Sequence, residues 1–130
     1  MNWLLDTNII SELARREPDA GVLRWAAAAG AVALSVVTVE EIHYGLAWRP
    51  NARIAAWFEG FFAAALVLPV SADIARRAGE LRGGLAAAGQ VRTQADMLIA
   101  ATAQVQQLTL VTRNLRDFAG CGIGLLDPFQ

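Results

Sequence analysis

Four acidic side chains stand where an expected strand ends or an expected helix begins. They are Asp6, Glu41, Asp96 and Asp117. Carboxylates suit two kinds of chemistry, namely proton transfer to or from a reacting group and the all-oxygen coordination that Mg²⁺ and Mn²⁺ prefer. Either use requires that acids far apart in the sequence come together in the fold.

Asp6 follows a short apolar run, Trp3–Leu5, and precedes a stretch in which apolar residues recur at helical spacing. This pattern predicts a strand that leads into a helix, with Asp6 at the carboxyl end of the strand. In an open α/β sheet, ligands bind at that end. The local alternative is a helix cap, because Asp, Thr and Asn are common at that position and Asp6, Thr7 or Asn8 would each serve.

The other three acids have a similar local alternative, because each lies three residues after a possible N-cap residue. The segments are Thr38-x-x-Glu41, Thr93-x-x-Asp96 and Asn114-x-x-Asp117. The first two match the capping-box pattern and the third resembles it. Capping explains each spacing separately but does not explain a convergence of all four acids. The remaining acids are expected on solvated faces or in turns: Glu12, Glu17, Asp19, Glu40, Glu59, Asp73, Glu80 and Asp127.

Strands and helices are predicted to alternate along the chain. The expected strands cover residues 3–5, 32–35, 66–68, 108–111 and 123–126. The expected helices cover residues 9–13, 18–29, 38–48, 51–65, 71–84 and 93–105, with Gly89 as an alternative end of the fifth. This alternation predicts one α/β domain over residues 1–130, with a mostly parallel sheet between two layers of helices. Because carboxyl-end loops of parallel strands share one sheet edge, the four acids are expected to converge.

Composition limits the possible surroundings and partners of the chain. Its hydrophobic content of 55% and mean hydropathy of +0.38 favour an oligomer or a partner that covers apolar surface. The single cysteine, Cys121, cannot form an intrachain disulfide, which favours the cytoplasm. The longest apolar run is too short to span a membrane, and Asp6 interrupts what would be the apolar part of a leader. A net charge of −1 argues against a broad basic surface for nucleic acid.

Five blocks of the sequence carry a family resemblance. They are the Asp6-Thr7-Asn8 block at 4–11 and the blocks at 34–45, 96–103, 110–118 and 126–129. In this order and spacing the chain resembles the PIN-domain family, in particular the VapC-like and Fit-type toxins of type II toxin-antitoxin systems. The resemblance implies a PIN-like α/β fold and an endoribonuclease that depends on Mg²⁺ or Mn²⁺. It also implies a homodimer and a VapB-like antitoxin, with DNA bound only through that antitoxin.

The same resemblance assigns roles to individual residues. Asp6, Glu41 and Asp96 match the family's acids, and Asp117 is favoured over Asn114 as the fourth. Asp6 and Asp96 are expected to hold the principal metal ion and Asp117 to help with a second, while Glu41 orients or deprotonates the attacking water. Polar and basic neighbours are expected to bind the RNA or to support the acids: Thr7, Asn8, Thr112, Asn114, Arg92 and Arg113.

Three alternatives remain beside this interpretation. The chain could be a catalytically weak PIN subunit of a DNA-binding toxin-antitoxin regulatory complex. An aspartyl-phosphate phosphatase also places Asp after its first strand, but it needs a second Asp where this chain has Asn8. Arg92 and Arg113 could simply be exposed surface charges.

Cys121 is expected to be a buried small residue. His43 lies two residues after Glu41 on a helix and is expected to point away from the acids.

Overall fold

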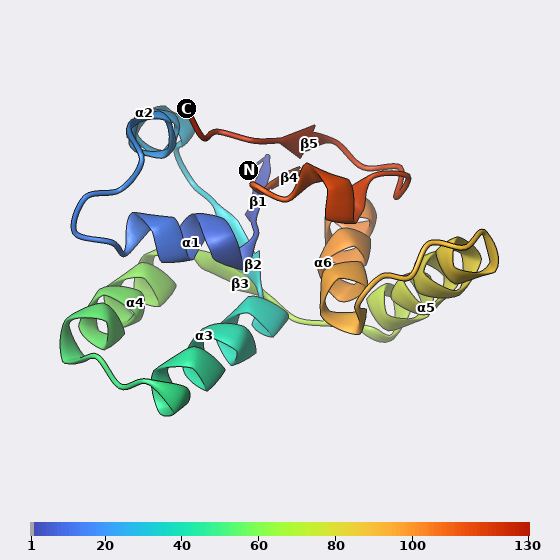
Figure 1. Ribbon diagram of the computed structural model, residues 1–130, viewed down its shortest axis with the longest axis horizontal. Coiled ribbons are helices and arrows are strands. Elements are labelled where there is room, and N and C mark those ends of the chain that lie inside the picture. The colour runs from blue at the N-terminus through green and yellow to red at the C-terminus, as the bar shows by residue number, and fades with distance from the viewer. Residues whose placement is uncertain (1) are drawn as a thin grey trace.

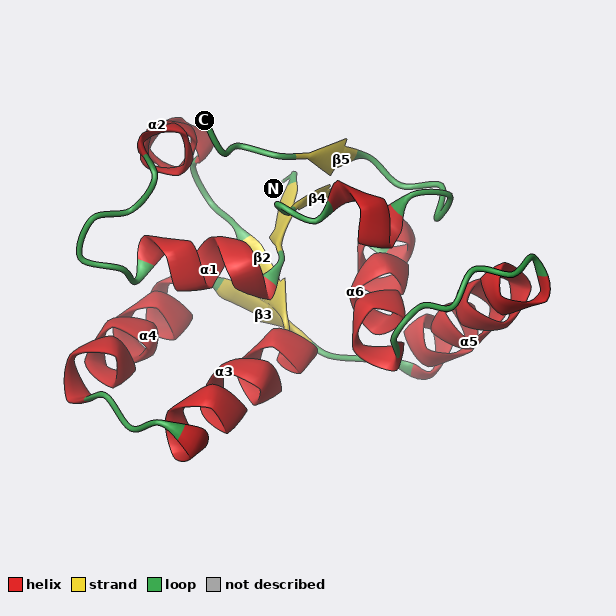
Figure 2. Ribbon diagram, viewed as in Figure 1, coloured by secondary structure: helices red, strands yellow, loops and turns green. Residues whose placement is uncertain are grey.

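Five short parallel strands form the centre of the computed structural model, which describes residues 2–130. The strands are β1 (Trp3–Leu5), β2 (Ala33–Ser35), β3 (Leu66–Leu68), β4 (Thr109–Val111) and β5 (Leu125–Leu126). Their order in the sheet is β3-β2-β1-β4-β5, with Leu4 paired to Ala33 on one side and to Leu110 on the other. The mostly parallel sheet predicted from the alternation of elements is therefore confirmed (Figure 2).

Helices cover both faces of this sheet (Figure 1). Within residues 2–130 they are α1 (Thr7–Leu13), α2 (Ala20–Ala29), α3 (Val36–Trp48), α4 (Ala52–Ala64), α5 (Ala72–Ala87) and α6 (Gln94–Val105), followed by the short 3₁₀ helix η1 (Leu115–Phe118). None of these helices is long and apolar enough to cross a membrane.

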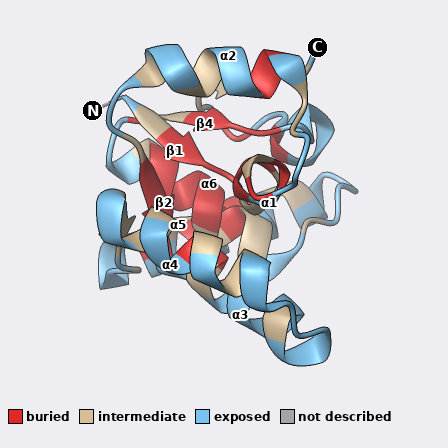
Figure 3. Cartoon of the chain, turned by 90° about the vertical axis from the view of Figure 1, so that its left-hand side faces the viewer, coloured by how far each residue is buried: buried red, intermediate tan, exposed pale blue. Residues whose placement is uncertain are grey.

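Two hydrophobic cores lie on opposite faces of the sheet, because successive side chains of a strand point in opposite directions. Leu4 and Leu110 belong to the core that α5 and α6 cover. Leu5 and Val111 belong to the core that α1 to α4 cover. Burial is concentrated in β1, β2, β4, α1 and α6, whereas α2, α3 and α4 expose their outer sides (Figure 3). The three-layer α/β architecture is confirmed.

Helix α3 begins earlier than the sequence pattern predicts. Ser35 ends strand β2 and also caps α3, because its Oγ accepts a hydrogen bond from the Val37 N–H at 3.0 Å. Thr38 is therefore inside the helix, and the predicted capping box between Thr38 and Glu41 is wrong. The predicted cap at Thr93 is confirmed, since its hydroxyl accepts from the Asp96 N–H at 3.1 Å.

Glu12 corrects another expectation, because it is buried and not on a solvated face. Its carboxylate accepts a hydrogen bond from the Asp19 N–H at 2.8 Å and pairs with Arg15 at 3.1 Å. Asp19 in turn caps α2 and accepts from the N–H of Gln130 at 3.1 Å. These bonds join the end of α1 to α2 and hold the C-terminal tail beside α2 (Figure 1).

Candidate active site

The carboxyl ends of β1 and β4 form the centre of the candidate site. The chain leaves β1 towards β2 and β3 and later returns to β4 on the other side of β1, so the strand order reverses between β1 and β4. Such a reversal opens a crevice at the carboxyl ends of the strands, where open α/β sheets bind ligands. Asp6 follows β1 directly and is 5% exposed, and Thr112 follows β4 directly and is fully buried.

Three hydrogen bonds fix both oxygens of the Asp6 carboxylate. Oδ1 accepts a hydrogen bond from the Thr7 N–H at 2.8 Å, and this bond caps α1. Oδ2 accepts from the Thr112 hydroxyl at 2.8 Å and from Asn8 Nδ2 at 3.1 Å. Asn8 also accepts from the Arg113 N–H at 3.1 Å. The capping alternative is thus true for Asp6, and the same carboxylate lies at the ligand-binding edge of the sheet.

Glu41 is connected to Asp6 through Thr7, the next residue in the chain. The Thr7 hydroxyl donates to Glu41 Oε1 at 2.6 Å and lies 3.1 Å from the hydroxyl of Thr38. Thr38 is fully buried, and the sequence analysis considered it only as a helix cap. No local pattern indicates its contact with Thr7, because the two residues belong to different helices.

The four acids influence one another electrostatically. Burial raises the pKa of Asp6 to about 6, the Thr112 and Thr7 hydrogen bonds act against this rise, and the charges of Asp96 and Glu41 add to it. Burial also raises the pKa of Asp96, where the Thr93 hydrogen bond opposes the rise and the charges of Asp117 and Glu41 add to it. The charges of Glu41 and Asp96 therefore act on Asp6, and those of Glu41 and Asp117 act on Asp96, while a common site for all four acids stays a prediction.

This donor set fits a divalent cation by its chemistry. In residues 2–130, no group of three or more Asp, Glu, His or Cys side chains is close enough to hold a metal ion as it stands. Mg²⁺, however, keeps several water ligands and commonly takes only one or two carboxylates. A cation here would relieve the mutual repulsion of the acids and lower the raised pKa of Asp6.

Comparison with known proteins identifies the family. The family model for the PIN domain matches residues 3–120. The chain belongs to the PIN-domain family. It is 36% identical over 136 residues to the VapC ribonuclease Y4jK of Sinorhizobium fredii, an alignment that covers 98% of this chain and 97% of that protein.

Solved structures of other proteins share this PIN fold. The crystal structure of VapBC2 from Rickettsia felis bound to a promoter DNA fragment matches with a TM-score of 0.85 and 26% identity, over 100% of both chains. A toxin-antitoxin complex from Klebsiella pneumoniae matches with a TM-score of 0.78 and 29% identity, over 99% of both chains.

The basic residues near the acids of this PIN domain do not point into the crevice. Arg92 donates to the backbone carbonyls of Asp117 and Ala119, at 2.6 and 2.9 Å. The guanidinium of Arg113 lies 4.3 Å from the ring centre of Phe129, in the C-terminal tail. Their expected contacts with RNA phosphates stay predictions, and each arginine would have to leave these partners to make them.

Asn114 and Asp117 lie at the far side of the PIN-domain crevice. The Asn114 N–H donates to the Thr112 hydroxyl at 3.0 Å, but its side chain makes no capping bond to η1 within residues 2–130. Asp117 is exposed in the first turn of η1, and its charge helps to raise the pKa of Asp96. The choice of Asp117 over Asn114 as the fourth acid stays a prediction.

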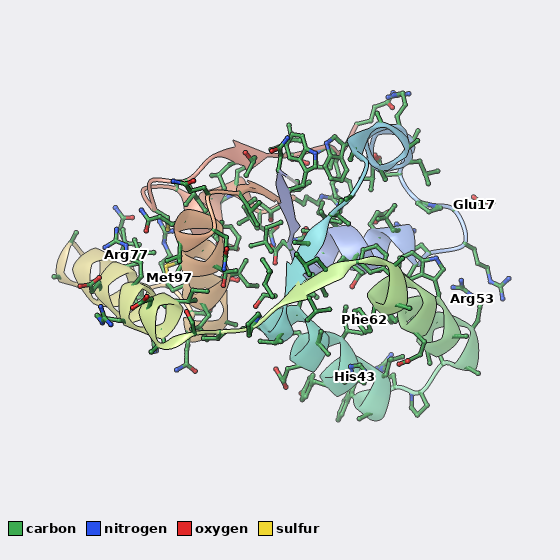
Figure 4. The ribbon with its side chains drawn as sticks, turned by 180° about the vertical axis from the view of Figure 1, so that it is seen from behind. Glu17, His43, Arg53, Phe62, Arg77 and Met97 are labelled. Carbon is green, nitrogen blue, oxygen red and sulfur yellow. The ribbon has the colours of Figure 1, made fainter. Side chains whose placement is uncertain are left out.

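Two other residues lie where the sequence predicted. His43 stacks on Phe62 with ring centres 5.9 Å apart, and its Nδ1 lies 2.8 Å from the Val39 carbonyl oxygen (Figure 4). Cys121 is buried against Met97, with the two sulfur atoms 3.9 Å apart. Neither residue takes part in the acid cluster.

A groove of about 690 Å³ adjoins the acids of the PIN domain, between α1, α3 and α4. Thr7 and Glu41 line it beside the acids, and apolar side chains line its middle: Ala14, Ile42, Leu46, Ile54 and Phe58. Four arginines also line it: Arg15, Arg16, Arg49 and Arg53. No sequence pattern indicates this groove, because its residues come from three helices and the connections between them and share no motif.

Proposed function

We propose that this chain is an endoribonuclease toxin that hydrolyses RNA phosphodiester bonds with Mg²⁺ or Mn²⁺, and that residues 1–130 act as a single PIN domain. The observation that carries the proposal is the cluster of four interacting acids beside β1 and β4, in which burial raises the pKa of Asp6 to about 6. Similarity to a VapC ribonuclease over 98% of the chain supports the nuclease activity.

In this mechanism, Asp6 and Asp96 would hold the principal cation and Asp117 would help to hold a second. When bound, the cation neutralises the carboxylates and stabilises charge on the scissile phosphate. Thr112 and Asn8 keep the Asp6 carboxylate in one orientation through their hydrogen bonds. These same polar groups, with Thr7 and Asn114, are also the candidates for contact with the phosphate.

Glu41 orients the attacking water and accepts its proton, while the bond from Thr7 holds the Glu41 carboxylate. The water oxygen attacks phosphorus in line with the leaving oxygen. The bond between phosphorus and the 3′ oxygen breaks. One product then carries a 5′-phosphate and the other a 3′-hydroxyl. The leaving oxygen takes its proton from solvent.

A cleavage assay tests this function directly. The purified chain should cleave total cellular RNA at a rate that rises and saturates with added Mn²⁺, stops with EDTA and returns when Mn²⁺ is in excess. Sequencing the new RNA ends should give 5′-phosphates at defined sites. A folded chain that leaves RNA intact at every Mn²⁺ concentration would contradict the proposal. That result would favour the alternative of a catalytically weak subunit in a DNA-binding complex.

The antitoxin partner is proposed to dock in the groove between α1, α3 and α4. An apolar middle with arginines around it suits an amphipathic peptide that carries acidic residues. Glu41, where the groove meets the acids, would receive an arginine from that peptide, and the resulting ion pair would block the catalytic crevice. DNA would be bound through the antitoxin alone, since the chain has a net charge of −1. A related complex, VapBC2 of Rickettsia felis, was crystallised with promoter DNA.

Gly45 provides a test of this docking site. It lines the groove, and apart from its chain neighbours and the backbone of its own helix, no described atom lies within 4 Å of the position that a Cβ would take there. Gly45→Trp should therefore fill the groove without a clash and weaken inhibition by the cognate antitoxin about tenfold or more, which is about 1.4 kcal/mol. RNA cleavage without antitoxin should not change. Gly60→Trp, on α4 and equally open but outside the groove, is the control. Equal inhibition of both variants would rule out this site.

A second copy of the chain is proposed to cover the outer side of α3. Tyr44 and Trp48 lie one turn apart there and are 69% and 71% exposed. Large exposed aromatic side chains are typical of interfaces. The aromatic residues of α4 are less exposed, and Phe58 is buried in the core. The cytoplasm is the proposed location, without contact with a membrane.

A further inference from the structure

The Arg92 side chain joins the two chain segments that carry Asp96 and Asp117. Its Nη1 donates to the carbonyl oxygen of Asp117 at 2.6 Å, and its Nη2 donates to the carbonyl oxygen of Ala119 at 2.9 Å. Nη2 also donates to Gln90 Oε1 at 3.0 Å, within the loop that leads to α6. A single guanidinium therefore connects the loop before α6 with both sides of Phe118.

The two segments differ in how firmly other contacts hold them. Asp96 lies in the first turn of a 12-residue helix, which Thr93 caps. Asp117 lies on η1, a 3₁₀ helix of only four residues, and such short helices have poor hydrogen-bond geometry. The buried ring of Phe118, which is 1% exposed, anchors η1 to the core but leaves the Asp117 side chain in solvent. Arg92 adds a direct connection to α6.

Arginine suits this connection because its planar fork presents several donors in a fixed geometry. Hydrogen bonds from a charged donor are also stronger than those between neutral groups. Both acceptors are backbone carbonyls, so the contact constrains the path of the chain at Asp117 and leaves its carboxylate free.

We propose that Arg92 is a positioning residue that holds the Asp117 carboxylate in place relative to Asp96, so that the two acids serve one divalent-cation site. This inference rests on the proposed function. It differs from the role expected from the sequence, in which Arg92 neutralises an RNA phosphate. The hydrogen bonds of Arg92 act on the site through the Asp117 segment.

A double-mutant cycle with Mn²⁺ alone tests the inference. Titration calorimetry without RNA should show Mn²⁺ binding about tenfold weaker in Arg92→Ala and in Asp117→Asn. The double variant should bind no more weakly than Asp117→Asn, because the hydrogen bonds of Arg92 act through the Asp117 segment. The positive charge of Arg92 also acts on Asp96, but it opposes cation binding, so its loss cannot by itself weaken binding. Additive losses, or unchanged binding in Arg92→Ala, would overturn the inference.

Two further variants separate positioning from charge. Arg92→Lys keeps the charge but loses the fork, so it should bind Mn²⁺ more weakly than the natural chain. Arg116→Ala removes an exposed charge from η1 itself and should leave Mn²⁺ binding unchanged. If Arg92→Lys binds as tightly as the natural chain, charge alone explains Arg92 and the inference is wrong.

Hydrogen exchange gives a readout that needs no metal. The N–H groups of Asp117 and Ala119 donate within the η1 turn, to Asn114 and Arg116. Both should exchange faster in metal-free Arg92→Ala and at the natural rate in Arg116→Ala. An unchanged exchange rate in Arg92→Ala would contradict the positioning role.

The outcome for Asp6→Ala separates this inference from the proposed function. If Mn²⁺ binding does not depend on Asp6, the proposed function itself is wrong. If Asp6 is required but the Arg92 cycle is additive, only the positioning role is wrong.

Discussion

Asp6→Ala and Asp96→Ala should each lower the rate of Mn²⁺-dependent RNA cleavage at least about 1,000-fold, equivalent to about 4 kcal/mol of transition-state stabilisation. Each variant removes a carboxylate from the centre of the acid cluster, where burial raises the pKa of both groups. Asp96→Ala should leave the metal-free fold intact, whereas Asp6→Ala also removes the cap of α1 and the acceptor of the Thr112 hydroxyl and should lower the free energy of unfolding by about 1–3 kcal/mol without unfolding the chain. Initial cleavage rates and thermal unfolding curves, measured on the same preparations, check both expectations.

Asp73→Ala is the matched control for Asp96→Ala. Asp73 also lies in the first turn of a helix, α5, but it is exposed and pairs with Arg76 at 3.0 Å on the surface. The Asp73→Ala variant should cleave RNA at the natural rate, since Asp73 contributes nothing to the acid cluster. Undiminished cleavage by both Asp6→Ala and Asp96→Ala would contradict the assignment of the active site.

Thr112→Val should lower RNA cleavage about 100-fold, which is the upper range for loss of a group that orients a metal ligand. The Thr112 hydroxyl donates to Asp6 Oδ2 and accepts from the Asn114 N–H, and valine of the same shape can do neither. The lost partners are buried or partly buried, so the free energy of unfolding should fall by about 1–3 kcal/mol. Cleavage assays and denaturant titrations measure the two effects.

The same variant should move the pH dependence of Mn²⁺ binding. In the natural chain, protonation of Asp6 opposes binding, so affinity should fall as the pH drops through about 6, the pKa of Asp6. The Thr112 hydrogen bond lowers this pKa, and its loss should therefore raise the pKa and move the midpoint to higher pH. Thr112→Ser keeps the hydroxyl and should restore the natural midpoint. A midpoint that is the same in the valine and serine variants would contradict this role.

Local patterns predicted most of the fold. The alternation of apolar runs and helical spacing located every strand, and the cap at Thr93 followed from residue type alone. The errors arose where one residue belongs to two elements, or where a side chain binds a backbone group outside its own element. Ser35 ends β2 and caps α3, which moved the helix start, and Glu12 is buried because it binds the Asp19 N–H seven residues away.

The sequence by itself determined the elements, the family and the edge of the sheet that carries the four acids, because these depend on periodicity, residue type and order along the chain. The tertiary structure alone decided which groups hold those acids. Thr112 reaches Asp6 across 106 residues because β4 pairs with β1, and Thr7 reaches Glu41 across 34 residues because α3 packs beside α1. Arg92, whose contact with RNA stays a prediction, binds the Asp117 backbone across 25 residues. Such contacts depend on strand order and helix packing, which no local pattern specifies.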